Sequence, residues 1–463
     1  MKIATIIKAT TLGVVVATAS PSFATTLTDA LIQAYQTNPS LRVARSGLRA
    51  TDESVRQAKG ALEPTLSAGA SFDKLDGTST LTNTTPTSGV YIQASIPIYT
   101  GGTLLNAVDQ ARFNVLANRQ SLILTEQQVL LDAVTAFMDV RQDQENVELN
   151  INSVRVLTEE VRAANERFEV GEVTRTDVAQ AEARLAASES DLERERGNLK
   201  ISINFYISTI GSKPKDLRVP PKTPKLPATP DAAEAVAIAK NPTILLQQFN
   251  VKAAEKGLEI ARGGVLPTVS ANASVTYSNN NSSRATVSDT QTISAIGLGL
   301  TQPIYQGGRL NSNQRQALAF LDQSKAELQL SGLQVRENVK SAYAVWIAST
   351  ASIIARRKQV SAAQIAFDGA SEEAKLGART TLDVLNSEQD LNEAQNDLVT
   401  AIRNEYVSSY TVLAAMGLLT VNHLGLGVES YNPDVNYQAV SGVNKFGAQR
   451  QKMMEKLKIL NGK

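Results

Sequence analysis

The chain contains two copies of one pattern, and this internal duplication restricts its fold more than any other feature. Residues 27–211 and 230–417 present the same motifs in the same order. An Asn-Pro pair occurs once in each copy, and so does the motif Pro-Ile-Tyr-x-Gly-Gly, at 97–102 and 303–308. A unit of this length far exceeds the roughly 20–50 residues of solenoid repeats. The sequence therefore predicts a molecule built from two equivalent halves.

The correspondence continues through the second part of each copy. At a constant offset of 206, six residues of the first copy recur in the second: Gly171, Thr174, Asp177, Val178, Glu182 and Leu185 return as Gly377, Thr380, Asp383, Val384, Glu388 and Leu391. We therefore divide the chain into four parts after residue 24. These are a first repeat at 25–210, a linker at 211–230, a second repeat at 231–420 and a C-terminal segment at 421–463.

Residues 1–24 have the pattern of a secretory signal peptide. Two lysines precede an apolar run, and Ser22-Phe23-Ala24 resembles a cleavage site. Removal takes two of the 46 basic residues and none of the 45 acidic ones, which leaves a net charge of −1. Such a nearly neutral chain gives no electrostatic reason to expect nucleic-acid binding.

The chain has no cysteine. Disulfides, thiolate metal sites and a lipidated N-terminal cysteine are therefore excluded. After residue 24 no run of about 18 apolar residues follows, so a membrane-spanning helix is not expected. An exported protein without a lipid anchor fits a Gram-negative periplasm or outer membrane.

Four segments alternate between apolar and polar residues, which is typical of strands with two different faces. They form two predicted hairpins, at 65–99 and 267–305. A strand that crosses a bilayer needs about 9–11 residues, with one apolar face and one polar face. Alternation alone does not distinguish such strands from a half-buried sheet in a soluble domain. Four strands cannot close a barrel, so the membrane interpretation requires several copies of the chain.

Two proline-free segments, 102–170 and 308–376, predict helices that are too long for an ordinary globular domain. At about 1.5 Å per residue, each helix would reach about 100 Å. The predicted helices that follow, 174–210 and 380–417, carry apolar residues at seven-residue spacing. This spacing favours supercoiled packing of neighbouring helices.

Three further segments complete the predicted organisation. One helix is predicted before each hairpin. The linker at 211–230 holds six of the 15 prolines and is expected to be extended and semi-rigid. The C-terminal segment loses the periodicity, and its last part, 446–463, is basic and is expected to be peripheral or flexible.

The duplicated order of helix, hairpin, very long helix, Gly turn and heptad helix resembles the TolC family of outer-membrane efflux proteins. The Asn-Pro pairs and the Pro-Ile-Tyr-x-Gly-Gly motifs support this resemblance over residues 27–420. It implies an α+β membrane protein that assembles as a homotrimer. Four strands from each protomer would form a twelve-stranded transmembrane β-barrel, and the long helices would form a periplasmic α-barrel. The linker and the C-terminal segment would lie in an equatorial belt.

The resemblance also implies a gate at the periplasmic end, where Gly171 and Gly377 mark the helix-turn tips. The implied gate residues are Thr176, Asp177, Arg379 and Asp383. Arg379 would bind Thr176 and Asp177, because an arginine can latch two helix pairs through a carboxylate and a hydroxyl. Asp383 would contribute to a ring of carboxylates that favours cations in the tunnel.

Two observations bear on this gate. Thr174-x-x-Asp177 and Thr380-x-x-Asp383 match a helix-capping pattern, so capping is an alternative role for Asp177. Arg379 has no capping role, and the latch hypothesis rests mainly on it. An acidic residue expected from the family is replaced by Asn386, and an expected tyrosine by Ala374. These replacements predict a less acidic and less tightly latched constriction.

No catalytic pattern is visible, since the sequence lacks a Ser/His/Asp order, metal-ligand spacing and a Gly-rich phosphate loop. Neither an enzyme nor a cofactor is predicted. The resemblance implies a passive exit duct for drugs, toxic amphiphiles or secreted polypeptide. Its partners would be a periplasmic adaptor and an inner-membrane pump, driven by protons or by ATP. The alternative is a secreted or surface coiled-coil protein, such as an adhesin stalk.

Overall fold

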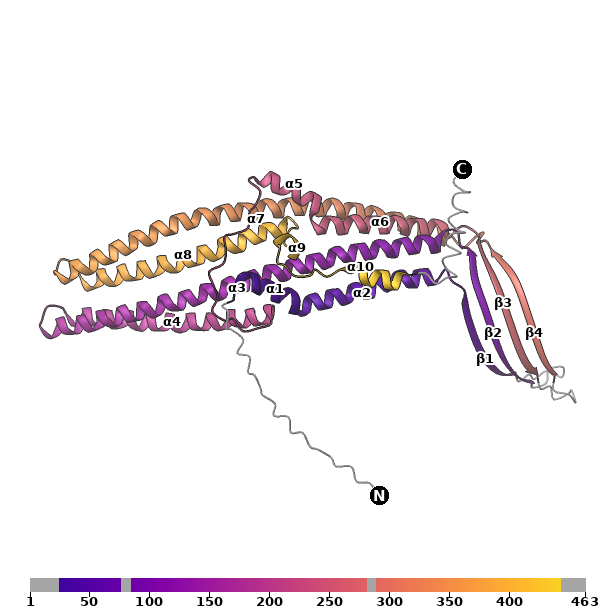
Figure 1. The fold of residues 1–463 in the computed structure, drawn as a ribbon, viewed down its shortest axis with the longest axis horizontal. Helices are drawn as coiled ribbons and strands as arrows, with labels where there is room; N and C mark the ends of the chain where they lie inside the picture. Colours follow the sequence, from indigo (N-terminus) through magenta and orange to yellow (C-terminus); the bar gives the residue numbers. More distant parts are fainter. Residues whose placement is uncertain (1–24, 76–84, 281–288, 443–463) are drawn as a thin grey trace, which may run out of the picture.

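The structure is a computed structural model that describes residues 25–75, 85–280 and 289–442. The predicted signal peptide at 1–24 and the basic residues 446–463 lie outside this described part. Ten helices and four strands within it form an elongated molecule, in which long helices run side by side and one sheet extends from their end (Figure 1). The fold is therefore mostly helical with an antiparallel sheet, in agreement with the predicted class.

The two repeats contain the same succession of six elements. The first consists of α1 Leu27–Thr37, α2 Pro39–Gly60, β1 Thr65–Leu75, β2 Thr85–Tyr99, α3 Thr103–Glu169 and α4 Arg175–Ile210. The second consists of α5 Pro230–Lys240, α6 Pro242–Gly263, β3 Thr268–Asn280, β4 Asp289–Thr301, α7 Arg309–Lys375 and α8 Thr381–Ala415. Two short helices follow, α9 Val421–Leu424 and α10 Pro433–Ser441. Helices α3 and α7 each have 67 residues, which corresponds to about 100 Å.

The Asn-Pro pairs mark a helix break. The sequence predicts one helix before each hairpin, whereas the structure has two, because a residue before proline prefers an extended backbone. Asn38 accepts a hydrogen bond from the Ser40 N–H at 2.9 Å and donates to the Thr209 carbonyl at 2.9 Å. Asn241 makes the equivalent bonds in the second repeat. Each asparagine therefore caps one helix and ties the break to the end of α4 or α8.

The sheet is a simple antiparallel succession, β1-β2-β3-β4. Tyr91 lies over Gly69 on the neighbouring strand, where a Cβ atom would come within 2.6 Å of the tyrosine ring. Strand β4 ends at Thr301, before the predicted hairpin boundary at 305. Pro303 follows shortly after and cannot donate a ladder hydrogen bond.

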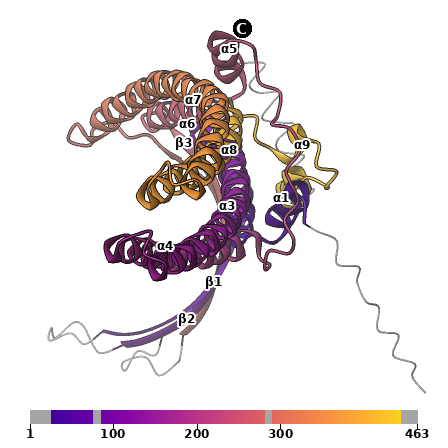
Figure 2. The same ribbon diagram turned by 90° about the vertical axis from the view of Figure 1, so that its left-hand side faces the viewer.

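The largest apolar core lies midway along the helices. Phe137 of α3 and Tyr206 of α4 are buried there together with residues of α1 and α9. The proline-rich linker crosses the same region, since the hydroxyls of Tyr406 and Tyr343 donate to the carbonyls of Pro221 and Pro227 at 2.8 Å and 2.7 Å. Viewed along the bundle, the long helices form a curved layer with α1, α5 and α9 on its convex side (Figure 2).

The described part of the C-terminal segment packs against the helices. The Asn436 amide of α10 donates to the Asp52 carboxylate of α2 at 2.7 Å. Arg119 of α3 forms an ion pair with Asp434 at 2.8 Å and lies 5.2 Å from the centre of the Tyr437 ring. Up to residue 442, the C-terminal segment is therefore a structural strap across α2 and α3.

Candidate functional site

Two features of this architecture stand apart from ordinary core packing: the helix turns at one end, and the sheet at the other. We call the end with the Gly171 and Gly377 turns the tip end. Both glycines have a positive φ, 80° and 74°, and no atom lies within 4 Å of a Cβ placed on either. Backbone conformation, rather than close packing, therefore explains glycine at both turns.

Capping boxes begin both helices that leave the tip end. Asp177 accepts hydrogen bonds from the backbone N–H and the hydroxyl of Thr174, at 2.8 Å and 2.7 Å. Asp383 accepts the same bonds from Thr380, at 3.0 Å and 2.8 Å. The hydrogen bonds from the threonines hold the pKa of both carboxyls below its ordinary value. The predicted capping role of Asp177 is therefore confirmed, and Asp383 shares it.

Arg379 does not bind the first turn within the chain. Its guanidinium binds the Glu373 carboxylate at 2.9 Å across the α7–α8 turn. Within the described part of the chain, no hydrogen bond or ion pair between Arg379 and either Thr176 or Asp177 is formed. Thr176 is exposed in the protomer. The latch from Arg379 to these two residues thus remains a prediction.

Asn386 and Ala374, where the chain departs from the pattern that the resemblance implies, make different kinds of contact. Asn386 accepts a hydrogen bond from Arg184 at 3.1 Å, which connects α8 to α4. Ala374 is buried with Ala370 and Val384 in a small apolar cluster between α7 and α8. The amide at 386 therefore retains a polar contact between the helix pairs, whereas the alanine at 374 offers only packing.

A seam joins the helix pair α3/α4 to the pair α7/α8, and no motif in the sequence predicts it. In its half nearer the tip end, the Ser153 hydroxyl donates to the buried Glu388 carboxylate at 2.6 Å. Leu385 of α8 packs nearby among Leu157, Ala164, Val178 and Ala181, which belong to α3 and α4. One signal was available, because Glu388 falls between Val384 and Leu391 in the apolar spacing of α8.

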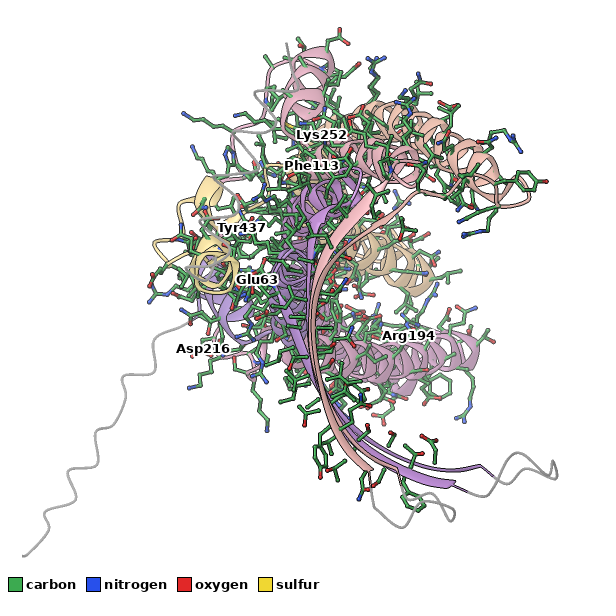
Figure 3. The ribbon with its side chains drawn as sticks, turned by 90° about the vertical axis from the view of Figure 1, so that its right-hand side faces the viewer. Glu63, Phe113, Arg194, Asp216, Lys252 and Tyr437 are labelled. Carbon is green, nitrogen blue, oxygen red and sulfur yellow. The ribbon has the colours of Figure 1, made fainter. Side chains whose placement is uncertain are left out.

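At the other end of the molecule, the sheet presents one continuous apolar face. The strand register places Ala70, Val90 and Tyr277 side by side, and likewise Ala68, Ile92 and Val275. Large apolar side chains on this face are exposed in the protomer, among them Leu66, Phe72, Ile296, Leu298 and Leu300. The sheet curves away from the helices, as the view from its end shows (Figure 3).

The opposite face of the sheet is polar. Ser270, Asn272, Ser274 and Thr276 alternate with the apolar positions of β3. Ser95 of β2 donates to the Asn272 side chain at 2.8 Å. The sheet thus separates an apolar side from a hydrogen-bonding side, which matches the predicted alternation.

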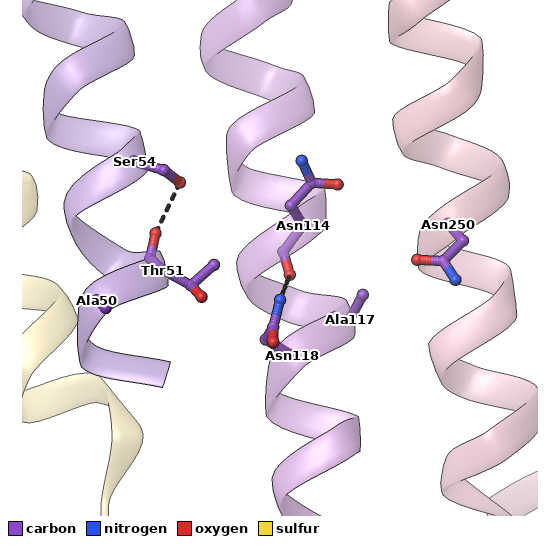
Figure 4. Close-up of a pocket in the computed structure, with 7 residues that line it drawn as sticks. All are labelled: Ala50, Thr51, Ser54, Asn114, Ala117, Asn118 and Asn250. Atoms are coloured by element: carbon purple, nitrogen blue, oxygen red, sulfur yellow. Dashed lines mark hydrogen bonds between the residues drawn. The ribbon is translucent and has the colours of Figure 1, made fainter. Parts of the chain in front are cut away.

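A shallow groove of about 460 Å³ lies between α2, α3 and α6, lined by uncharged side chains (Figure 4). Thr51 and Ser54 lie on one side, Asn114 and Asn118 in the middle, and Asn250 on the other. The Ser54 hydroxyl and the Asn118 amide donate to carbonyls of their own helices. The groove is therefore a polar wall rather than an enclosed binding pocket.

The described residues contain neither a group of metal-ligating side chains nor a membrane-crossing helix. In this part of the chain, no group of three or more His, Asp or Glu side chains is arranged so that it could hold a metal ion. None of the helices in this part combines the length and the apolar character that a membrane-crossing helix needs. The tip end, the seam and the two-faced sheet together form the candidate site.

Comparison with known proteins places this geometry in context. The family model described as outer membrane efflux protein matches residues 30–205 and 235–418, one segment in each repeat. Outer membrane efflux protein BepC of Brucella suis is 37% identical over 425 residues, which cover 92% of both chains. Outer membrane protein TolC of Escherichia coli is 26% identical, over 85% of this chain and 83% of TolC.

A solved structure gives the same result for the fold. The Campylobacter jejuni CmeC outer membrane channel superimposes with a TM-score of 0.74 at 15% identity. The match covers 90% of this chain and 89% of CmeC. At this level of identity the likeness concerns the fold alone.

Proposed function

Because this chain belongs to the outer membrane efflux protein family, we propose that it acts as a homotrimeric duct through which cargo leaves the periplasm passively. The protein is an outer-membrane export protein, and family membership favours this function over a structural coiled-coil stalk. The proposal concerns its assembly, its partners and its gate.

The observation that carries the proposal is the uncovered, two-faced sheet. Its strands have 11, 15, 13 and 13 residues, enough for the roughly 9–11 residues that a tilted strand needs in a bilayer. The order β1-β2-β3-β4 leaves β1 and β4 at the edges. Open edges are not tolerated in lipid, so they require pairing with neighbouring copies. Three copies would supply twelve strands in a closed barrel, with the polar face lining its interior.

The long helices support a tunnel beneath this barrel. The curved layer seen along the bundle is one arc of a cylinder, and three such arcs would surround a central passage (Figure 2). The uncharged groove between α2, α3 and α6 would contribute hydrogen-bonding groups to the wall. No energy source is needed in such a duct, because the pump supplies the work.

The tip end is the proposed meeting point with a periplasmic adaptor and, through it, an inner-membrane pump. Both tips are helix turns with exposed side chains, including Glu172 and Leu376. They are suited to packing against helical hairpins of a partner. The cargo would be drugs, toxic amphiphiles or secreted polypeptide, depending on the pump.

The proposed gate lies at the same end. Thr176, Asp177, Arg379 and Asp383 are at the tips of the two helix pairs, and Arg379 pairs with Glu373 when it has no other partner. In a trimer, Arg379 would exchange Glu373 for Thr176 and Asp177 of a neighbouring copy. The capping bonds of Asp177 leave its other carboxylate oxygen available for such a contact.

Planar-bilayer conductance of the detergent-purified protein tests this function. A duct with a closed tip end should give small or flickering currents after insertion. A protein that inserts, as shown by flotation with the vesicles, but never conducts would refute the proposed duct.

A further inference from the structure

Along the seam between the helix pairs, three polar contacts join α3 to α8, in addition to the Arg184–Asn386 contact between α4 and α8. Asp139 pairs with Arg403 at 2.7 Å, and Gln142 donates to Thr400 at 3.2 Å. Ser153 donates to Glu388 at 2.6 Å. Helix α8 begins at the tip end and runs antiparallel to α3. Glu388 precedes Arg403 on α8 and therefore lies about 22 Å closer to the tip end. Among these three contacts, separation of the pairs from the tip end therefore breaks Ser153–Glu388 before Gln142–Thr400 and Asp139–Arg403.

The Ser153–Glu388 contact differs from the other two because it is buried. Glu388 is 8% exposed, Ser153 4% and Ser188 6%. The Ser188 hydroxyl of α4 lies 3.3 Å from the Ser153 hydroxyl of α3, which in turn donates to the Glu388 carboxylate of α8. Three helices from both pairs thus meet in one short hydrogen-bonded chain.

A carboxyl is an unusual choice at this position. Val384 and Leu391, which flank Glu388 on the same face of α8, are buried apolar residues. A leucine at 388 would continue this packing without the cost of removing a carboxylate from water. Burial raises the pKa of Glu388, while the Ser153 hydrogen bond and the charge of Arg184 oppose that shift.

The repeat supplies an internal comparison. Glu182 occupies the position in α4 that Glu388 occupies in α8, and Glu182 is exposed in the protomer. The buried environment of Glu388 is therefore specific to α8, because the face of α8 that carries Glu388 packs on the other helix pair, whereas Glu182 of α4 stays exposed. This asymmetry suggests a role beyond the general packing of the repeat.

We infer that Glu388, Ser153 and Ser188 form a clasp that keeps the tip end closed while leaving it easy to open. The hydrogen bonds hold α8 against α3 and α4, and the buried carboxyl regains water when the pairs separate. The serine hydroxyls thus stabilise the clasp, whereas the cost of burying the Glu388 carboxyl weakens it. Glu388 and Ser153 are positioning residues of the gate, and this inference rests on the proposed duct function.

The two opposing contributions predict variants with opposite effects. Ser153→Ala removes the donor and leaves a buried carboxylate without its partner, which should raise the fraction of time spent open about tenfold or more. Glu388→Leu removes the acid and completes the apolar seam, which should lower that fraction below the wild-type value. The double variant should behave like Glu388→Leu, because the acid that Ser153 serves is then absent.

The measurement is the open fraction of single channels in planar bilayers, with thermal unfolding of each variant as a folding check. Glu393→Gln is the matched control, since Glu393 is an exposed glutamate on the same helix. Glu388→Gln serves as a milder variant of the same size should Glu388→Leu fail to fold. It should lower the open fraction, because it removes the charge and keeps an acceptor.

The possible outcomes distinguish a failure of the proposed clasp from a failure of the proposed duct function. If wild type conducts but Ser153→Ala and the Glu388 variants shift the open fraction in the same direction, the seam is ordinary packing and the clasp is wrong. The clasp is also wrong if all variants match Glu393→Gln. An inserted wild type without conductance would instead overturn the proposed duct itself.

Discussion

Leu385→Ala tests whether opening of the tip end separates α8 from the pair α3/α4. Leu385 belongs to α8 and is 1% exposed, and its neighbours Leu157, Ala164, Val178 and Ala181 all belong to the other pair. Truncation of a buried leucine costs about 2–5 kcal/mol, from lost transfer free energy and from the cavity that remains. We use the lower figure, because neighbouring side chains at a helix interface can relax and partly fill the cavity that truncation leaves.

If the open state has already lost this contact, truncation destabilises only the closed state. A difference of about 2 kcal/mol corresponds to about a 30-fold shift in the closed-to-open equilibrium. The assay is the open fraction of single channels in planar bilayers. Leu382→Ala is the control, because Leu382 lies three residues away on the same helix and is 42% exposed. The control should leave the open fraction unchanged.

The reasoning fails if Leu385→Ala lowers the thermal stability of the protein yet leaves the open fraction at the wild-type value. That result would mean that the Leu385 contact survives in the open state. The opening would then have to occur between protomers or within a helix pair, rather than along this seam.

Three further predictions concern other parts of the molecule. Arg379→Ala should raise the conductance of a latched trimer, whereas Glu373→Gln should lower it by freeing Arg379 for neighbouring copies; equal currents in all three proteins would remove Arg379 from the gate. Hydrogen bonds from Thr174 and Thr380 lower the folded-state pKa of Asp177 and Asp383, so their stabilisation is complete above the unfolded value and is lost as pH falls through the lowered pKa. The protection of amides from exchange in the first turns of α4 and α8, relative to the intrinsic rate at each pH, should therefore fall below about pH 4, and Asp177→Asn and Asp383→Asn should abolish this pH dependence. Leu298→Arg, on the apolar sheet face, should disfavour membrane insertion by about 2–4 kcal/mol if it lies near the bilayer centre, whereas Ser274→Arg, on the polar face, should insert normally in the same fractionation assay.

Much of the fold could be predicted because the sequence carries local signals twice. Proline-free runs, the Gly turns and period-two alternation placed the long helices and hairpins close to their observed positions. The break at Asn38 was missed, because an asparagine before proline reads equally well as a kink inside one helix. The capping role of Asp177 could be predicted, since a capping box lies within four consecutive residues.

The seam could not be predicted, because it depends on contacts far apart in the chain. Ser153 and Glu388 are 235 residues apart, and neither carries a motif that points to the other. Glu388 is visible in the sequence only as an acid in an apolar spacing. Its burial follows from the way α8 lies on α3, which heptad periodicity alone does not specify. The partner of Arg379 was likewise open to several choices, since the turn itself offers Glu373.

The two repeats have diverged where they would otherwise form identical seams. Leu385 corresponds to Ala179 in the first repeat, and Glu388 corresponds to Glu182. Both α8 residues are buried inside the chain, whereas both α4 residues are exposed. In the proposed trimer, the equivalent face of α4 would meet α7 of the next copy, with an alanine in place of the leucine. Seams within and between protomers would then alternate around the tip end, and those within protomers would bury the larger apolar side chain. A movement that opens the ring must separate seams of unequal strength, so the substitution at position 385 helps to determine where the ring opens first.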